Sequence, residues 1–220
     1  MKGTFGNLSA TAVPFLFSTF SILSCWWMTI TLLRAWWVPL EVDHGAWIKL
    51  GVAIMVMEFI IVHSGGFFAG LTIKANSRWK RVASFSGLVL FYSLAAFVIA
   101  DSTQSMSLLY SFGFIMLSRL LTSFREVSEE EMSAITNRSA TSALLYLIVV
   151  ILSVAIPFPS GGLTPRILKE FYPDPGDGIW QKEPQRALAA GAIYFFSLGL
   201  FELMSAKQSL QRVAARKLWE

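Results

Sequence analysis

Six apolar runs, each close to the length that crosses a bilayer, follow one another along the chain. Because each residue of a helix adds about 1.5 Å, a hydrocarbon core of about 30 Å needs roughly 20 residues. The runs cover residues 13–33, 47–73, 82–100, 106–122, 141–158 and 187–204. The sequence therefore predicts an all-α, polytopic integral membrane bundle of about six transmembrane helices, with residues 1–220 forming one membrane domain.

The composition agrees with a membrane protein and argues against other classes. Hydrophobic residues make up 55% of the chain and charged residues only 15%, whereas a soluble domain has about 25% charged residues. This balance excludes a disordered chain and a cytosolic nucleotide-binding fold. The single cysteine, Cys25, lies inside the first run, so no intrachain disulfide forms. One cysteine and two histidines leave no Cys/His-rich zinc site, and we expect no metal centre.

The lysines and arginines lie in short clusters between the runs, a pattern that orients a membrane protein and does not indicate nucleic-acid binding. With the N-terminus in the cytoplasm, the inner side receives Lys2, Lys74, Arg78, Lys80, Arg81, Arg119, Arg125, Arg138, Lys207, Arg212, Arg216 and Lys217. The outer side receives half as many, namely Arg34, Lys49, Arg166, Lys169, Lys182 and Arg186. This bias and the even number of runs predict a multi-pass protein of an inner (plasma) membrane with both termini cytoplasmic. The interfacial tryptophans would be Trp36, Trp37, Trp47 and Trp180 outside and Trp79 and Trp219 inside.

Three segments outside the runs carry further predictions. Ser128 followed by Glu131 is a capping-box pattern, which indicates a short helix leading into the fifth run. The outer loop, residues 159–184, is long for a compact bundle. The tail, residues 205–220, resembles a basic amphipathic helix, which would lie on anionic lipids or pack against a neighbouring subunit.

Ionisable side chains inside hydrocarbon are costly, so each is a candidate functional residue. Counting along the second run places Glu58 about 16 Å deep, near the midplane. A carboxyl group at that depth has to be protonated, paired or hydrated, and Tyr92 in the third run is a candidate hydrogen-bond partner. His63 follows about 24 Å deep, but five residues turn a helix by roughly 140°, so Glu58 and His63 do not share a face.

Two more ionisable residues lie at a similar level near the inner side. Arg119 in the fourth run is about 24 Å deep and Glu202 in the sixth about 22 Å deep. One interpretation pairs Arg119 with Glu202 beside His63, as a proton or ion relay or as the polar wall of a cavity. In the other, Arg119 extends to the inner headgroups and Glu202 pairs with Lys207 or Lys74 near the surface.

The second run contains a cluster of small residues. Gly66 and Gly70 form a GxxxG pattern, and Gly65 with Ala69 repeats the spacing one residue earlier. Such a pattern predicts a close contact between helices. The alternative is a helix interrupted at residues 64–66, which would free backbone groups to bind ions or substrates.

Three functions are compatible with this inventory. The sparse polar content and the small-residue pattern favour a non-enzymatic accessory or structural subunit of a larger membrane complex, or a homo-oligomer. A small proton- or ion-coupled carrier that uses Glu58 and His63 is the alternative. A cofactor-binding redox subunit or a membrane enzyme is the third class, although no motif identifies a cofactor.

Overall fold

A computed structural model of the chain describes residues 5–74, 78–103, 129–173 and 175–217, and all regular structure in these ranges is helical. Among these residues, three segments are long and apolar enough to cross a membrane: Asp43–His63, Thr136–Ala155 and Pro184–Gln208. The predicted all-α class is confirmed for the described residues, and the three apolar segments indicate a membrane protein. The long helices are α1 (Phe5–Trp37), α2 (Ala46–Lys74), α3 (Arg78–Thr103), α5 (Glu129–Ala155) and α8 (Pro184–Lys217).

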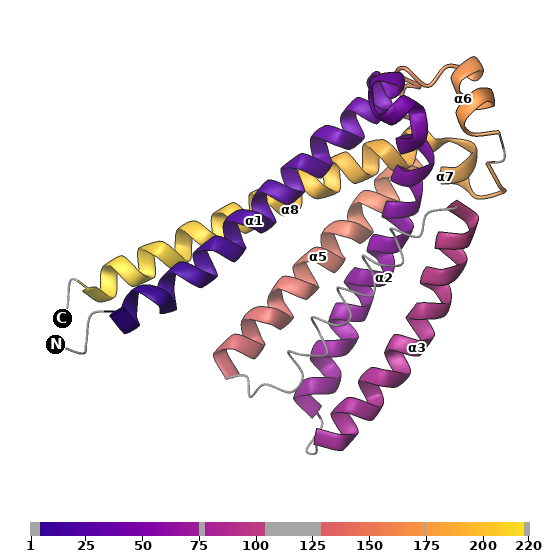
Figure 1. Cartoon of the computed structure of the whole chain (residues 1–220). Coiled ribbons are helices and arrows are strands. Elements are labelled where there is room, and N and C mark those ends of the chain that lie inside the picture. Colours follow the sequence, from indigo (N-terminus) through magenta and orange to yellow (C-terminus); the bar gives the residue numbers. More distant parts are fainter. Residues whose placement is uncertain (1–4, 75–77, 104–128, 174, 218–220) are drawn as a thin grey trace.

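The helices form two diverging groups that meet at one end of the molecule (Figure 1). One group is the arm, which consists of α1 and α8 packed along one another in opposite directions. The other group contains α2, α3 and α5, of which α2 is central because it packs against both α3 and α5. The first turn of α1 and the last turn of α8 lie at the far end of the arm.

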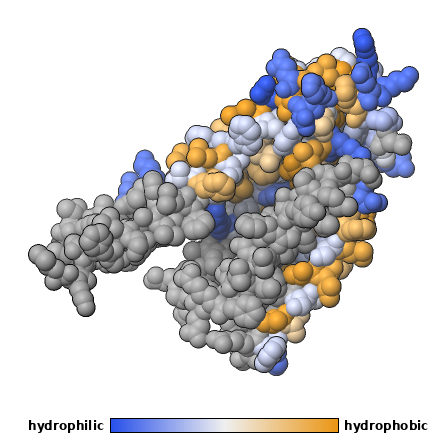
Figure 2. Space-filling model, in the orientation of Figure 1, coloured by the Kyte–Doolittle hydropathy of each residue, from blue (hydrophilic) through white to orange (hydrophobic). Residues whose placement is uncertain are grey.

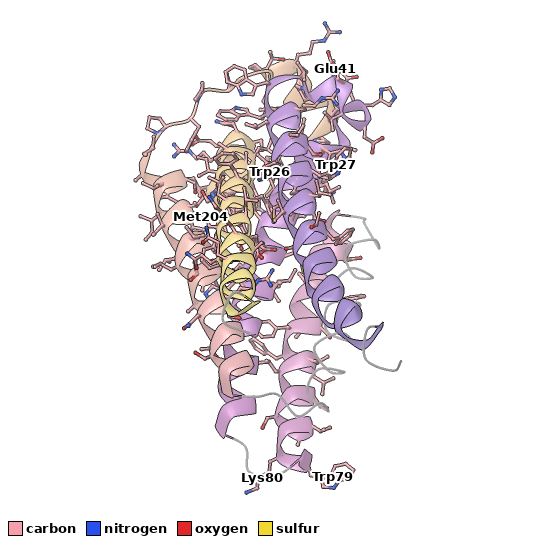
Figure 3. The ribbon with its side chains drawn as sticks, turned by 90° about the vertical axis from the view of Figure 1, so that its left-hand side faces the viewer. Trp26, Trp27, Glu41, Trp79, Lys80 and Met204 are labelled. Atoms are coloured by element: carbon pink, nitrogen blue, oxygen red, sulfur yellow. The ribbon has the colours of Figure 1, made fainter. Side chains whose placement is uncertain are left out.

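The end where the two groups meet is the cap, which comprises residues 38–45 and 156–183. It contains the short 3₁₀ helices η1 (Pro39–Glu41) and η2 (Asp43–Gly45) and the short helices α6 (Pro165–Phe171) and α7 (Ile179–Lys182). Hydrophilic residues gather over this end, whereas hydrophobic residues dominate the visible sides of the helices (Figure 2). Glu41 lies at the cap, and Trp79 and Lys80 lie at the opposite end of the molecule (Figure 3).

Arg186 on the first turn of α8 and Trp180 of the cap hold the last turn of α5 through hydrogen bonds. Arg186 donates to three carbonyl oxygens at that end, those of Ser153, Val154 and Ile156, at 2.9–3.1 Å. The last carbonyls of a helix have no partners within it, so a cation placed there satisfies them and complements the helix dipole. Trp180 donates its indole N–H to Ser153 Oγ at 2.9 Å. The described residues of the segment 159–184, predicted as a long loop, therefore contain the short helices α6 and α7 and contact the end of α5.

Small residues bring α8 close to its neighbours. Ala187, Ala189 and Ala190 are fully buried, and a Cβ atom added to Gly191 would lie 2.6 Å from Leu32 Cδ1 on α1. A Cβ atom on Gly199 would lie 2.6 Å from the ring of Trp26. These positions accept only a hydrogen atom, and close approach of helix backbones through small residues is the usual basis of packing in membranes.

The helix bounds agree with most of the predicted runs. Helices α1, α2 and α3 contain residues 13–33, 47–73 and 82–100, and α8 contains 187–204 and continues through Lys217, as predicted for the tail. Helix α5 begins at Glu129 and continues without interruption into the fifth run, so Arg138 belongs to the apolar helix and not to an inner loop. Residues 106–122, the predicted fourth span, lie outside the described residues.

Two predicted features of the sequence are corrected. Helix α2 is continuous from Ala46 to Lys74, so the predicted alternative of an interruption at residues 64–66 is wrong. The surroundings of Gly65, Gly66, Ala69 and Gly70 lie outside the described side chains. Trp36, expected to anchor the chain in the outer interface, is buried and donates to Pro159 O at 2.8 Å. It fixes the cap to the end of α1.

Candidate functional site

Glu58 forms a hydrogen bond between two of the apolar helices. The hydroxyl of Tyr194 on α8 donates to Glu58 Oε1 on α2 at 2.8 Å. Counting from the cap ends of the two helices places Glu58 about 18 Å and Tyr194 about 15 Å along their axes, so the two meet at one level. Tyr194 is fully buried in the main core. A buried hydroxyl needs a partner, and Glu58 supplies it.

The same two residues line a cavity between α2, α5 and α8 with a volume of about 180 Å³. Its other polar wall comes from α5, where Arg138, Ser139 and Ser142 face it. Aliphatic side chains of α2 and α8 complete the lining, namely Ile61, Val62 and Leu198. The cavity therefore combines one carboxyl group, one guanidinium and three hydroxyls with an apolar wall.

Glu202 lies on α8 about two turns after Tyr194. It forms an ion pair with the guanidinium of Arg138. Arg138 Nη2 lies 2.6 Å from Glu202 Oε1 and 3.3 Å from Ser21 Oγ. The side chain of Glu202 is only 6% exposed, whereas that of Arg138 is 55% exposed. One guanidinium thus joins α5 to both helices of the arm. The predicted partner of Glu202, Arg119, lies outside the described residues.

Tyr146 fixes the position of α5 beside the site. Its hydroxyl donates to Met55 O on α2 at 2.6 Å, one turn before Glu58. Its ring packs edge-on against that of Tyr194, with centroids 5.5 Å apart. Because both tyrosines are buried and each bonds across to α2, the three helices around the cavity have a fixed register.

The buried thiol of Cys25 on α1 lies within electrostatic reach of Glu58, Glu202 and Arg138. Helix α1 also borders the polar region, because Ser21 on this helix accepts a hydrogen bond from Arg138. Because Cys25 is the only cysteine of the chain, its reaction with thiol reagents would measure the accessibility of this region.

Two other predicted site residues, His63 and Tyr92, are not part of the cavity lining. His63 Nδ1 lies 2.7 Å from Phe59 O, and since a carbonyl oxygen only accepts, this nitrogen is the donor. The imidazole ring also stacks on Phe59, with centroids 4.0 Å apart, and it does not line the cavity. Tyr92 is buried in a second cluster between α2 and α3, beside Met57 and Ala96.

Tyr194, Ser139 and Ser142 were not predicted as site residues, and Arg138 was counted only among the basic residues of the inner side. A helical signal was present on α5, since Arg138, Ser142 and Tyr146 recur every four residues and share one face. On α8, Tyr194 and Glu202 are eight residues apart and also share a face. These two polar stripes indicate a polar seam between helices.

The fold and the site together define an all-helical chain with three candidate membrane spans and a polar cavity lined by residues of three helices. No protein-family model, no curated protein and no solved structure matches the chain. Among the described residues, no group of three His, Cys, Asp or Glu side chains is placed to hold a metal ion.

Proposed function

We propose that the protein is a six-span inner-membrane protein with both termini cytoplasmic and that it works as a small proton- or ion-coupled carrier. The alternating directions of the helices support the topology, since α1, α3 and α5 run toward the cap and α2 and α8 run away from it (Figure 1). Helix α3 ends at the cap and α5 begins at the other end. A connection between those ends covers the depth of the bundle, which supports a further crossing by residues 106–122.

The observation that carries the carrier proposal is the carboxyl group of Glu58, which faces a cavity at mid-depth of the apolar bundle. The cavity has a volume of about 180 Å³. Pockets for drug-sized ligands measure about 300–1,000 Å³. The cavity therefore suits a proton, a hydrated ion or a small solute.

In this proposal the charge on Glu58 changes during each cycle. An ionised carboxylate in hydrocarbon is costly, so Glu58 favours states in which it holds a proton or a cation. The hydrogen bond from Tyr194 keeps the carboxyl group at the cavity wall in either state, because both forms of a carboxyl group accept hydrogen bonds. Arg138, paired with Glu202, stabilises the approach of the arm to α5.

The substitution Glu58→Gln tests the proposal, because an amide keeps the shape and the hydrogen bond but neither binds a proton nor carries charge. Purified protein in liposomes that contain a pH-sensitive dye is exposed to small amines, amino acids, organic acids and alkali cations. The wild type should couple at least one of these solutes to proton movement, and Glu58→Gln should abolish this coupling without lowering the membrane level or the helix content.

Glu41→Gln is the matched control, since Glu41 is an exposed carboxylate at the cap and should be dispensable (Figure 3). If no solute moves protons through the wild type, or if Glu58→Gln keeps full coupling, the carrier proposal is wrong. If Glu58→Gln collapses the amount of folded protein in the membrane, Glu58 is structural.

An accessory subunit of a larger membrane complex, or a homo-oligomer, is the second candidate, and the packing of α5 favours it. Only 17% of the apolar window in α5 is buried, against 50% for α2 and 56% for α8. Leu144, Leu147 and Ile151 face outward from α5 and offer a surface to lipid or to another helix. Native mass spectrometry of the untagged protein in mild detergent tests this candidate. Additional chains beyond the 24.5 kDa protomer would support it, and a lone protomer would refute it.

The C-terminal part of α8 is a candidate lipid-binding segment. Helix α8 continues to Lys217, beyond the predicted span, and its last turns carry lysine and arginine residues. We propose that this segment lies on anionic lipids of the cytoplasmic leaflet, where each basic residue contributes about 1 kcal/mol of attraction.

A further inference from the structure

The ion pair between Arg138 and Glu202 lies farther from the cap than the site around Glu58. Counting from the cap end of α8 places Tyr194, which donates to Glu58, about 15 Å and Glu202 about 27 Å along the axis. Counting back from the cap end of α5 places Arg138 about 26 Å along that helix. Because Arg138 also lines the cavity, the ion pair lies at the end of the cavity that is remote from the cap.

On the cap side of the cavity the helices pack closely. In α8, residues 187–195 are all buried except Ile193. Tyr146 of α5 packs its ring against that of Tyr194 and donates its hydroxyl to Met55 O of α2. A core packed in this way contains few voids larger than a water molecule. We therefore expect no route for a solute from the cavity toward the cap.

The burial of α5 differs between its two halves. Its buried residues, Tyr146, Val149 and Ser153, all lie in the half toward the cap. Among the α5 residues before Tyr146 whose burial is described, none is buried. Arg186 adds a further anchor at the cap, because it donates to three carbonyl oxygens at the end of α5. Helix α5 is thus held firmly at the cap and packs more loosely at its other half.

In the loosely packed half, Arg138 joins α5 to the arm. Its Nη2 lies 2.6 Å from Glu202 Oε1 on α8 and donates to Ser21 Oγ on α1 at 3.3 Å. Because its side chain is 55% exposed, the guanidinium can move from Glu202 to water or to headgroups. A contact that can be released at one end of a helix, combined with an anchor at the other end, forms a hinge.

We propose that the Arg138–Glu202 pair is the gate of the cavity, which is entered past this pair from the end of the molecule that carries Lys80 (Figure 3). The inference rests on the proposed carrier function and assigns the entrance to its site. When the guanidinium leaves Glu202, the half of α5 before Tyr146 swings away from the arm about the anchor at the cap, and the cavity opens. Opening also brings water to Glu202, so its charge is not left unpaired in apolar surroundings. Carriers expose a site by comparable movements of one group of helices against another.

The reactivity of a thiol at position 142 tests the entrance. In a Cys25→Ser background, Ser142→Cys places a thiol on the α5 wall of the cavity. The probe is a membrane-impermeant methanethiosulfonate with a trimethylammonium group, added to one side of membrane vesicles that contain the full-length protein. Lys80→Cys and Glu41→Cys, at opposite ends of the molecule, identify the side that the probe reaches (Figure 3). Ser142→Cys should react from the side on which Lys80→Cys reacts and not from the side of Glu41→Cys.

Glu202→Gln tests the gate, because it removes the charge that holds Arg138 and does not alter a residue that lines the cavity. Ser142→Cys should then react at least about tenfold faster, the ratio expected for the loss of one hydrogen bond between charged groups. The increase should be confined to the side of Lys80→Cys. Glu202→Asp keeps the charge on a shorter side chain and should give a smaller increase. Glu41→Gln breaks an exposed ion pair in the cap and, as the matched control, should leave the rate unchanged.

Three results would overturn the inference. They are reaction of Ser142→Cys from the side of Glu41→Cys, an equal rate with and without the charge of Glu202, and a faster reaction from both sides, which indicates general loosening. If Glu202→Gln does not reach the membrane, the comparison is made with Glu202→Asp, and an unchanged rate again overturns the gate.

These rates do not depend on transport, so the gate and the carrier proposal can fail separately. Proton coupling that is lost in Glu58→Gln, together with equal thiol rates, would refute the gate alone. A protein that couples no solute to protons, although Ser142→Cys responds to Glu202→Gln as expected, would contradict the carrier proposal alone.

Discussion

The guanidinium of Arg138 connects three helices. In its ion pair with Glu202, the two side chains differ greatly in burial. Glu202 is buried, so without Arg138 its charge would remain in apolar surroundings or its carboxyl group would have to take up a proton. Arg138 is 55% exposed and can reach water or headgroups when Glu202 is removed. The pair is therefore asymmetric, because loss of one partner costs more free energy than loss of the other.

Arg138→Gln should destabilise the protein more than Glu202→Gln does, and the double variant should fall between them. We expect Arg138→Gln to lower the free energy of unfolding by about 1–3 kcal/mol, less than the roughly 3–5 kcal/mol of a fully buried pair, because Arg138 is half exposed. Thermal unfolding of the three variants in detergent measures the order. Equal losses for both single variants would show that Glu202 is not buried as a charge.

At the level of single residues, the sequence predicts which ionisable groups enter the membrane but not which groups meet. Glu58 and Glu202 could be identified from their depth alone. The donor to Glu58, Tyr194, could not, because its helix follows in the sequence by more than a hundred residues and contacts between distant helices depend on their relative rotation. Arg138 was misassigned because a positively charged residue near an apolar run is usually a flanking residue.

Among the elements, α8 is distinguished by small side chains on the face that meets α1 and α2. Buried alanines and glycines let the helix axes approach, and the gap left by each missing Cβ is filled by Leu32, Met55 or Trp26. Figure 3 shows Trp26 and Trp27 midway along α1, between the cap and the termini. Trp26 covers Gly199, so this tryptophan packs within the arm.

Gly191→Ala should destabilise the bundle, whereas Gly87→Ala on α3 should not. The added methyl group at Gly191 overlaps Leu32 and Met55, which should lower the free energy of unfolding by about 1–3 kcal/mol. A methyl group at Gly87 meets nothing within 4 Å, so only the helix propensity changes, and stability should rise by up to about 1 kcal/mol. Thermal unfolding of the two variants gives the comparison. A stable Gly191→Ala protein would mean that α8 packs less closely than described.

The positions of the helices agree best with the sequence prediction, because a helix of this kind depends mainly on the length of its own apolar run. The start of α5 is the instructive difference. Its first turns are polar, yet they continue the helix of the fifth run from Glu129, since nothing in residues 129–140 breaks a helix. The small-residue pattern at residues 65–70 predicted a close contact between helices there. Among the described residues, the close contacts between long helices are at Gly51, Gly191 and Gly199.

For the molecule as a whole, the divergence of the arm from the other helices could not be predicted from the sequence. Run lengths predict the spans, and the charge bias predicts their orientation. Neither predicts the angles between the helices, which depend on the fit of side chains at each interface. The cap was expected as a long loop, and its order comes from contacts such as Trp36 with Pro159, which join residues distant in the sequence.

Cysteine accessibility checks the proposed topology of the whole molecule. In a Cys25→Ser background, Glu41→Cys should react with a membrane-impermeant maleimide added to spheroplasts. Lys80→Cys should react only after the membrane is opened, because the two positions lie at opposite ends of the molecule (Figure 3). Labelling of both from the same side would contradict the topology. The unmodified protein, whose one cysteine is buried, provides the background signal.

The pairing of α1 with α8 has a consequence for how the protein is made. The first helix emerges from the ribosome long before its partner, and residues 38–183 must be synthesised between them, which takes roughly 7–30 s at about 5–20 residues per second. During that interval α1 lacks α8, whose Gly199 packs against Trp26 of α1. Because Tyr194 and Glu202 also belong to α8, a chain released early would lack both the partner of α1 and one wall of the cavity. Synthesis of α8 is thus the step that completes the site.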